Sequence, residues 1–165
     1  MIEAKFFCGK GKVNMWRVAV AGKVTDGFME AARKRLSETG VLLERYDPYL
    51  PEQDYDAILV FPDTDLSLSK YCCRILIIPD ELISDGAIIN DTSAQCVISY
   101  GLSPKNTVTL SSTNDGKNVV ALQRDIMSLD GSLILRQEFT LDCDLQHYET
   151  MALASLIAIS GVLEQ

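Results

Sequence analysis

Short apolar runs separated by polar segments dominate the first hundred residues, and their lengths favour strands over long helices. The runs at residues 16–21, 57–61 and 74–78 end at glycine or proline, and shorter ones lie at 41–45 and 96–100. Continuous apolar runs bounded by turn-forming residues are typical of strands covered on both faces. The pattern therefore predicts a mostly parallel sheet, with one more short strand at 87–89.

One helix is predicted between the first two strands, over residues 27–39. Asp26 is a suitable N-cap for it, and Gly40 is a suitable C-terminal stop. Apolar side chains at Phe28 and Leu36 recur on one side of this segment. The resulting strand-helix-strand unit has the size of a parallel crossover, about thirty residues.

The pattern changes in the last third of the chain. Residues 107–111 and 119–123 alternate more regularly and flank Asp115-Gly116, which predicts a hairpin. Residues 132–140 predict one further strand, so this part forms an antiparallel extension of the sheet. The final helix, expected over 145–163, is apolar around most of its circumference and is therefore expected to be buried.

The composition is that of one folded domain covering residues 1–165. The chain is 47% hydrophobic, which supplies enough apolar side chains for a core. Its net charge of −8 argues against nucleic acid and anionic membrane surfaces as partners. No apolar run has the length of a membrane span, and the start of the sequence has no signal-peptide pattern.

The five cysteines show no spacing typical of a disulfide framework or a redox motif. Cys72 and Cys73 are adjacent and precede an apolar run, so they are expected to be core or edge residues. Reduced thiols and the absence of a targeting signal together predict a cytoplasmic protein.

The junction between the first strand and the first helix is a candidate phosphate-binding turn. Backbone N–H groups point at an anion at such junctions, and Gly22, Lys23 and Thr25 lie at this one. A phosphate-binding loop with its lysine and hydroxyl would require lysine where Asp26 stands. The sequence therefore favours an ordinary strand-to-helix turn over a nucleotide site.

Two acids directly follow the strand at 57–61, where open α/β sheets place ligands. Asp63 and Asp65 are candidates for binding a divalent cation or a small ligand, although a solvated acidic loop is the commoner arrangement. No complete metal-ligand set is predicted, and no cofactor is expected.

His147 is the single histidine, so any nucleophile-histidine pair would have to use it. Cys143 is the nearest thiol in sequence, four residues earlier. A structural role for His147 at the helix start, through a capping or packing contact, is the favoured alternative.

Two segments together carry a family resemblance. Residues 96–102 read Cys-Val-Ile-Ser-Tyr-Gly-Leu, and residues 145–155 contain His147 followed by Ala152-Leu153-Ala154. They resemble the "ViTYGl" strand and the "G-x-H-N-x-x-N-A-L-A-A" helix start of the Mur ligases, the ATP-dependent amide ligases of cell-wall peptide synthesis. Residues 18–22 look like the strand that enters the family's P-loop, and 78–81 give a looser match to its "vlN-x-D-D" turn.

The resemblance implies an α/β fold like that of the Mur ligase central domain. This is a mostly parallel, Rossmann-like sheet flanked by helices, with an antiparallel hairpin extension. Ligase activity is not implied, because the P-loop lysine and hydroxyl positions hold Asp26 and Gly27, and the family's two asparagines are Tyr148 and Met151. The family's magnesium-binding glutamate and histidine segment also has no match, so no catalytic residue is carried over.

The predicted function is a non-catalytic, Mur-ligase-like domain with a binding or regulatory role linked to cell-wall metabolism. Two alternatives stay open: a small enzyme that uses the acidic loop or the Cys143/His147 pair, and a homo-oligomeric interaction protein. The expected partners are a second copy, docked through the apolar C-terminal helix, and an unidentified protein or small ligand. The candidate ligand-binding residues are Gly22, Lys23, Thr25, Asp63, Asp65 and His147.

Overall fold

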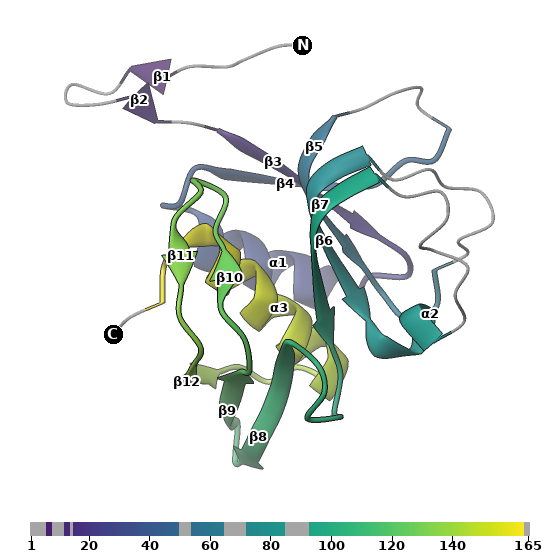
Figure 1. The fold of residues 1–165 in the computed structure, drawn as a ribbon, viewed down its shortest axis with the longest axis vertical. Helices are drawn as coiled ribbons and strands as arrows, with labels where there is room; N and C mark the ends of the chain where they lie inside the picture. The colour runs from purple at the N-terminus through teal and green to yellow at the C-terminus, as the bar shows by residue number, and fades with distance from the viewer. Residues whose placement is uncertain are drawn as a thin grey trace.

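The computed structural model describes residues 6–7, 12–13, 15–49, 54–64, 72–84 and 93–163 (Figure 1). The elements of the first half are β1 (Phe6–Phe7), β2 (Lys12–Val13), β3 (Trp16–Ala21), α1 (Asp26–Leu36), β4 (Val41–Arg45), β5 (Tyr55–Val60), β6 (Cys72–Pro79) and α2 (Asp80–Ser84). Those of the second half are β7 (Ser93–Tyr100), β8 (Val108–Asn114), β9 (Lys117–Leu122), β10 (Ile126–Met127), β11 (Leu133–Ile134), β12 (Gln137–Asp142) and α3 (His147–Ser160).

The main sheet has eight strands in the order β12-β9-β8-β7-β6-β5-β3-β4. Strands β4 to β7 pair in parallel, and β8 joins β7 in parallel at the single pair Tyr100–Val108. Strands β9 and β12 run antiparallel to their neighbours. This arrangement confirms the predicted α/β class, a mostly parallel sheet with an antiparallel extension.

The order of the parallel strands creates a switch point between β3 and β5. From β3 the chain passes through α1 to β4 on one side, and β5, β6 and β7 then follow on the other side. In open α/β sheets, the crevice for ligands lies outside the carboxyl ends of the strands at such a point. This topology identifies the ends of β3 and β5 as the place to look for a site.

The helices cover the sheet unequally. Side chains of α1 and α3 share one core with alternate residues of the strands, such as Val18, Leu59 and Ile98. Helix α2 packs on the opposite face through Leu82, against a second core that includes Ile58 and Leu76. Both cores consist of the apolar runs, as expected for strands with two covered faces.

Helix α3 is buried along its length, as its sequence predicts. Every residue from 149 to 159 is buried. The helix contacts α1 and strands β7, β8 and β9, and Leu129 N donates a hydrogen bond to Ile159 O, 2.8 Å away. Figure 1 shows α3 behind the β10–β11 hairpin. The chain itself therefore covers this helix along residues 149–159, so that stretch offers no exposed surface for a second copy, and the homodimer stays a prediction.

The predicted hairpin is present between β8 and β9. Asp115 and Gly116 both have positive φ angles, 47° and 79°, as the two central residues of a type I′ turn require. The single strand predicted at 132–140 is wrong, because β11 pairs with β10 whereas β12 pairs with β9. Between them, Arg136 N donates to Asp125 Oδ1 at 2.8 Å, which holds the chain out of both ladders.

Some predicted elements fall outside the described residues, namely the strand at 87–89 and most of the loop that follows Asp63. Within the described part of the chain, no helix is long and apolar enough to cross a membrane.

Candidate functional site

The carboxyl ends of β3, β5, β6 and β7 meet the first turn of α3, and we call this surface the strand-end face. Four parallel neighbours necessarily end at the same edge of a sheet. The strand-end face comprises residues 22–25, 61–64, 80–81, 101, 106 and 146–149. Two side-chain contacts from α3, to α1 and to α2, close it on one side.

Gly22 forms the turn after β3, with a φ of +107° that side chains rarely permit. A Cβ atom here would lie 2.4 Å from Thr64 Oγ1 and 3.0 Å from Phe61 Cβ. The Thr64 hydroxyl itself lies 2.7 Å from Phe61 O and 3.1 Å from Ala21 O. The turns that follow β3 and β5 therefore pack directly on each other, and only glycine fits between them.

In this turn, the amide that follows Gly22 donates its hydrogen bond to a carboxylate of the chain itself. Lys23 N donates a long bond of 3.4 Å to Asp63 Oδ1. A phosphate-binding loop directs such amides at the ligand's oxygens. The structure therefore brings Gly22, Lys23 and Asp63 together, but with the negative charge supplied by the protein. Asp65 lies outside the described residues.

Thr25, and not Asp26, is the N-cap of α1. Its hydroxyl accepts a 3.1 Å bond from Phe28 N and donates a 2.6 Å bond to Glu149 Oε1. Asp26 is instead the first helical residue, and its exposed carboxylate pairs with Arg45 at 2.9 Å. The predicted cap was wrong because a threonine hydroxyl that bonds a carboxylate from α3 outcompetes the aspartate one residue later.

Glu149 belongs to the capping box that begins α3. Its Oε2 atom accepts a 3.3 Å bond from Gln146 N, while Oε1 accepts from Thr25. The side chain is buried, and each carboxylate oxygen has a donor, as a buried charge requires. One residue therefore joins the starts of α1 and α3 at the strand-end face.

Two tyrosines lie near the acids: Tyr148, on the strand-end face, and the fully buried Tyr100. The Tyr148 hydroxyl donates a hydrogen bond to Glu81 Oε1, and this bond raises the pKa of Tyr148 to about 12. The Tyr100 hydroxyl donates to Val60 O at 2.7 Å, and burial raises the pKa of Tyr100. The two rings pack edge to face with centroids 6.4 Å apart. Because both pKa values are raised, both phenols stay protonated near neutral pH and act as hydrogen-bond donors.

Asp80 lies over the end of β7. Asn106 Nδ2 donates to Asp80 Oδ2 at 2.8 Å. A Cβ atom at Gly101 would lie 2.5 Å from the same oxygen, so glycine is needed for this approach. The negative charges of Asp63, Asp80 and Glu81 therefore stand at the ends of successive strands.

The Cys143/His147 pair is not assembled as a nucleophile and base. The Cys143 thiol lies 3.7 Å from Thr150 Oγ1 and 3.6 Å from Asn118 Nδ2. His147 is exposed as the first residue of α3, and the cap of that helix is Gln146. A capping contact by His147 is therefore wrong, and the alternative that was predicted with it, a packing contact, stays a prediction.

Of the two adjacent cysteines, Cys73 is a core residue as predicted, whereas Cys72 is exposed at the start of an interior strand, β6. Cys72 is exposed, whereas Cys73 is buried and its pKa is raised to about 12, chiefly by burial. A thiol with such a pKa is unreactive near neutral pH.

Within the described ranges, no group of three or more histidine, cysteine, aspartate or glutamate side chains is arranged to hold a metal ion. Sequence reasoning missed several residues of the strand-end face: Thr64, Glu81, Asn106, Tyr148 and Glu149. Thr25 and Glu149 are 124 positions apart, so only the fold brings them into contact.

No protein-family model matches the chain, and no curated protein sequence matches it. The function of the strand-end face therefore has to be inferred from its own geometry.

Proposed function

We propose that this chain is a non-catalytic binding or regulatory domain with a scaffold like that of the Mur ligase central domain. Its strand-end face binds a neutral or cationic group, from a small ligand or a partner protein, in place of a nucleotide phosphate. The resemblance of residues 96–102 and 145–155 to the Mur ligases links that role to cell-wall metabolism.

The observation that carries the proposal is the closed turn at the end of β3. Asp63 accepts the Lys23 amide, and Thr64 fills the space beside Gly22. A phosphate oxygen at this turn would have to displace a carboxylate that is covalently part of the chain. The place of the nucleotide in a phosphate-binding loop is therefore taken by the protein's own groups.

The charges around the turn support the same conclusion. Asp63, Asp80 and Glu81 stand at consecutive strand ends, and Asp26 occupies the first position of α1. Like charges repel and unlike charges attract, and solvent and salt weaken both effects at exposed groups. These carboxylates oppose a polyphosphate and attract a cation.

A thermal-shift titration tests the proposal, with ATP and magnesium as the probe. A ligand at one hundred times its Kd stabilises the folded chain by about 2.7 kcal/mol, which raises Tm by several degrees. We expect millimolar MgATP to leave Tm within about one degree of its starting value, since Asp63 already accepts the amide of the turn after β3.

The Lys23→Ala variant provides the matched control, because it removes the lysine side chain and leaves the backbone amide of residue 23 in place. A saturable rise in Tm of the native chain that is lost in Lys23→Ala would contradict the proposal. ATP-dependent formation of an amide bond by the native chain would contradict it too.

A further inference from the structure

The outer edge of β12 is a sheet edge with a defined set of outward-facing backbone groups. Cys143 N donates to Gly116 O, so the amide of residue 143 points towards β9. Successive residues of an antiparallel strand point in alternate directions. The main-chain groups of Glu138, Thr140 and Asp142 therefore face away from β9.

Both ends of this edge are already capped, and its middle is open. Arg136 N donates to Asp125 Oδ1 at 2.8 Å, and Asp142 O accepts from Arg35 Nη2 at 2.6 Å. In the part of the chain that the structure describes, no hydrogen bond reaches the outward main-chain groups of Glu138 and Thr140. The open stretch is the site at which a further strand can pair.

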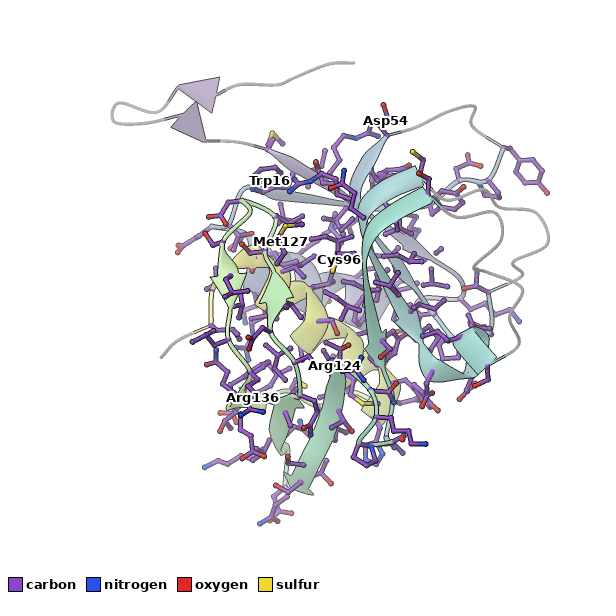
Figure 2. The ribbon with its side chains drawn as sticks, in the orientation of Figure 1. Trp16, Asp54, Cys96, Arg124, Met127 and Arg136 are labelled. Carbon is purple, nitrogen blue, oxygen red and sulfur yellow. The ribbon has the colours of Figure 1, made fainter. Side chains whose placement is uncertain are left out.

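The side chains along β12 form a pattern that is complementary to itself. Glu138, Thr140 and Asp142 occupy alternate positions of β12 and therefore share one face. Arg136, one residue before the strand, stands at the next alternate position of the sequence. Arg136, labelled in Figure 2, and Asp142 are exposed, and among the described residues neither side chain forms an ion pair. If a second copy of β12 pairs antiparallel with the first and the pairing is centred on Phe139, Arg136 of each copy lies opposite Asp142 of the other. The dimer then has one such pair at each end of the paired strands.

Charge selects this register over its neighbours. Pairing centred on Thr140 would place Glu138 of one copy opposite Asp142 of the other. Pairing centred on Glu138 would place the two Glu138 carboxylates opposite each other. Like charges directly opposite each other destabilise a sheet, whereas unlike charges stabilise it. In the Phe139 register the two Glu138–Thr140 pairs use the open main-chain groups, and the half-buried Phe139 rings meet at the two-fold axis.

We propose that β12 is the interface of a symmetric homodimer, in which the two sheets continue into each other. The occupant is a second copy because the edge complements itself and the interface of a two-fold dimer is formed by the same surface on both subunits. Leu135, which is 59% exposed, precedes the strand and adds apolar area to the contact.

The opposite edge of the sheet, β4, does not offer such pairing. Glu44 bonds Arg17 at 2.5 Å, and Arg45 bonds Asp26 at 2.9 Å. Its charges are thus neutralised within the chain, which leaves nothing to select a partner or a register.

Charge exchange tests the interface, with the oligomeric state measured by sedimentation velocity on the full chain. We expect a dimer for the native protein. Arg136→Asp and Asp142→Arg each place like charges opposite one another, and each should raise the dimer Kd roughly tenfold or more. The double variant, with both substitutions, restores the pairs and should restore the dimer.

A second variant tests the backbone pairing. Thr140→Pro removes an amide that points away from β9, a position where an edge strand tolerates proline, and should give a folded monomer. Leu42→Lys on β4 is the matched control and should leave the dimer unchanged. A native chain that stays monomeric at about 1 mM would overturn the proposal, as would a dimer that Arg136→Asp leaves intact. A double variant that is folded by circular dichroism yet monomeric would overturn it as well.

Discussion

At the scale of single residues, the strand-end face depends on positions that only one type of residue can occupy. Gly22 is the clearest, because its φ is positive and its missing Cβ leaves room for the Thr64 hydroxyl. The turns after β3 and β5 meet through this contact. The geometry that keeps Asp63 beside the Lys23 amide therefore depends on the glycine.

Gly22→Ala should lower the free energy of unfolding by about 2–3 kcal/mol, from backbone strain and the clash with Thr64. Gly27→Ala is the matched control, because a Cβ atom there meets nothing within 4 Å. Gly27 lies in α1, so its substitution should instead stabilise the chain by about 0.5–1 kcal/mol. Urea denaturation of both variants gives the comparison, and equal effects would show that the turn is not strained.

Tyr148 provides a test through pH. Its hydroxyl bonds Glu81, and its pKa is about 12 in the folded chain, above the value of about 10 in an unfolded one. A raised pKa means that the folded state favours the protonated phenol. The stability from this contact is therefore fully present below pH 10 and is lost as the pH rises towards 12.

Tyr148→Phe should be less stable than the native chain at pH 9, and the difference should shrink steadily up to pH 12. Thermal unfolding at a series of pH values measures it. Ionised tyrosines absorb at 295 nm, so the absorbance of the native chain minus that of Tyr148→Phe, followed over pH, gives an independent titration of Tyr148. A Tyr148 that titrates near pH 10 would show that the bond to Glu81 is not maintained in solution.

At the scale of elements, the starts of α1 and α3 form one hydrogen-bonded unit. Thr25 caps α1, and Glu149 closes the capping box of α3, while their side chains bond each other at 2.6 Å. The two helices lie on the same face of the sheet. Loss of either side chain therefore affects both helix starts.

A double-mutant cycle on Thr25→Ala and Glu149→Ala should show this coupling. Thr25→Ala alone should cost about 1 kcal/mol, as the loss of an N-cap does. The pair should depart from additivity by at least about 0.5 kcal/mol in the free energy of unfolding. Thr25→Ala combined with Glu138→Ala is the control, and its effects should add, because Glu138 bonds Ser111 instead. Additive effects in both pairs would contradict the coupling.

At the scale of the whole molecule, local sequence patterns predicted the helices and strands far better than they predicted the contacts between them. The apolar runs located β3, β4, β5 and β6, because burial on both faces leaves a signal in the sequence. The Asp115-Gly116 turn is equally local, since it follows from backbone freedom alone. The helix α2 was missed, because five residues carry too little periodicity to be recognised.

The candidate site was predicted only in part. The sequence indicated Gly22, Lys23 and Asp63 separately, and the strand order placed them together. The sequence could not indicate that Asp63 accepts the Lys23 amide, because these two residues are 40 positions apart and meet only where β3 and β5 are neighbours. The pairing of Thr25 with Glu149 is non-local for the same reason, and it also displaced the predicted cap.

The most direct test of the account is a nuclear magnetic resonance titration that follows the backbone amide of Lys23 as MgATP is added. The account predicts no saturable change at this amide or at those of its neighbours in the turn, because Asp63 already accepts its hydrogen bond. A saturable change confined to residues 22–25 would show that the turn opens to phosphate, and the chain would then be a nucleotide-binding domain.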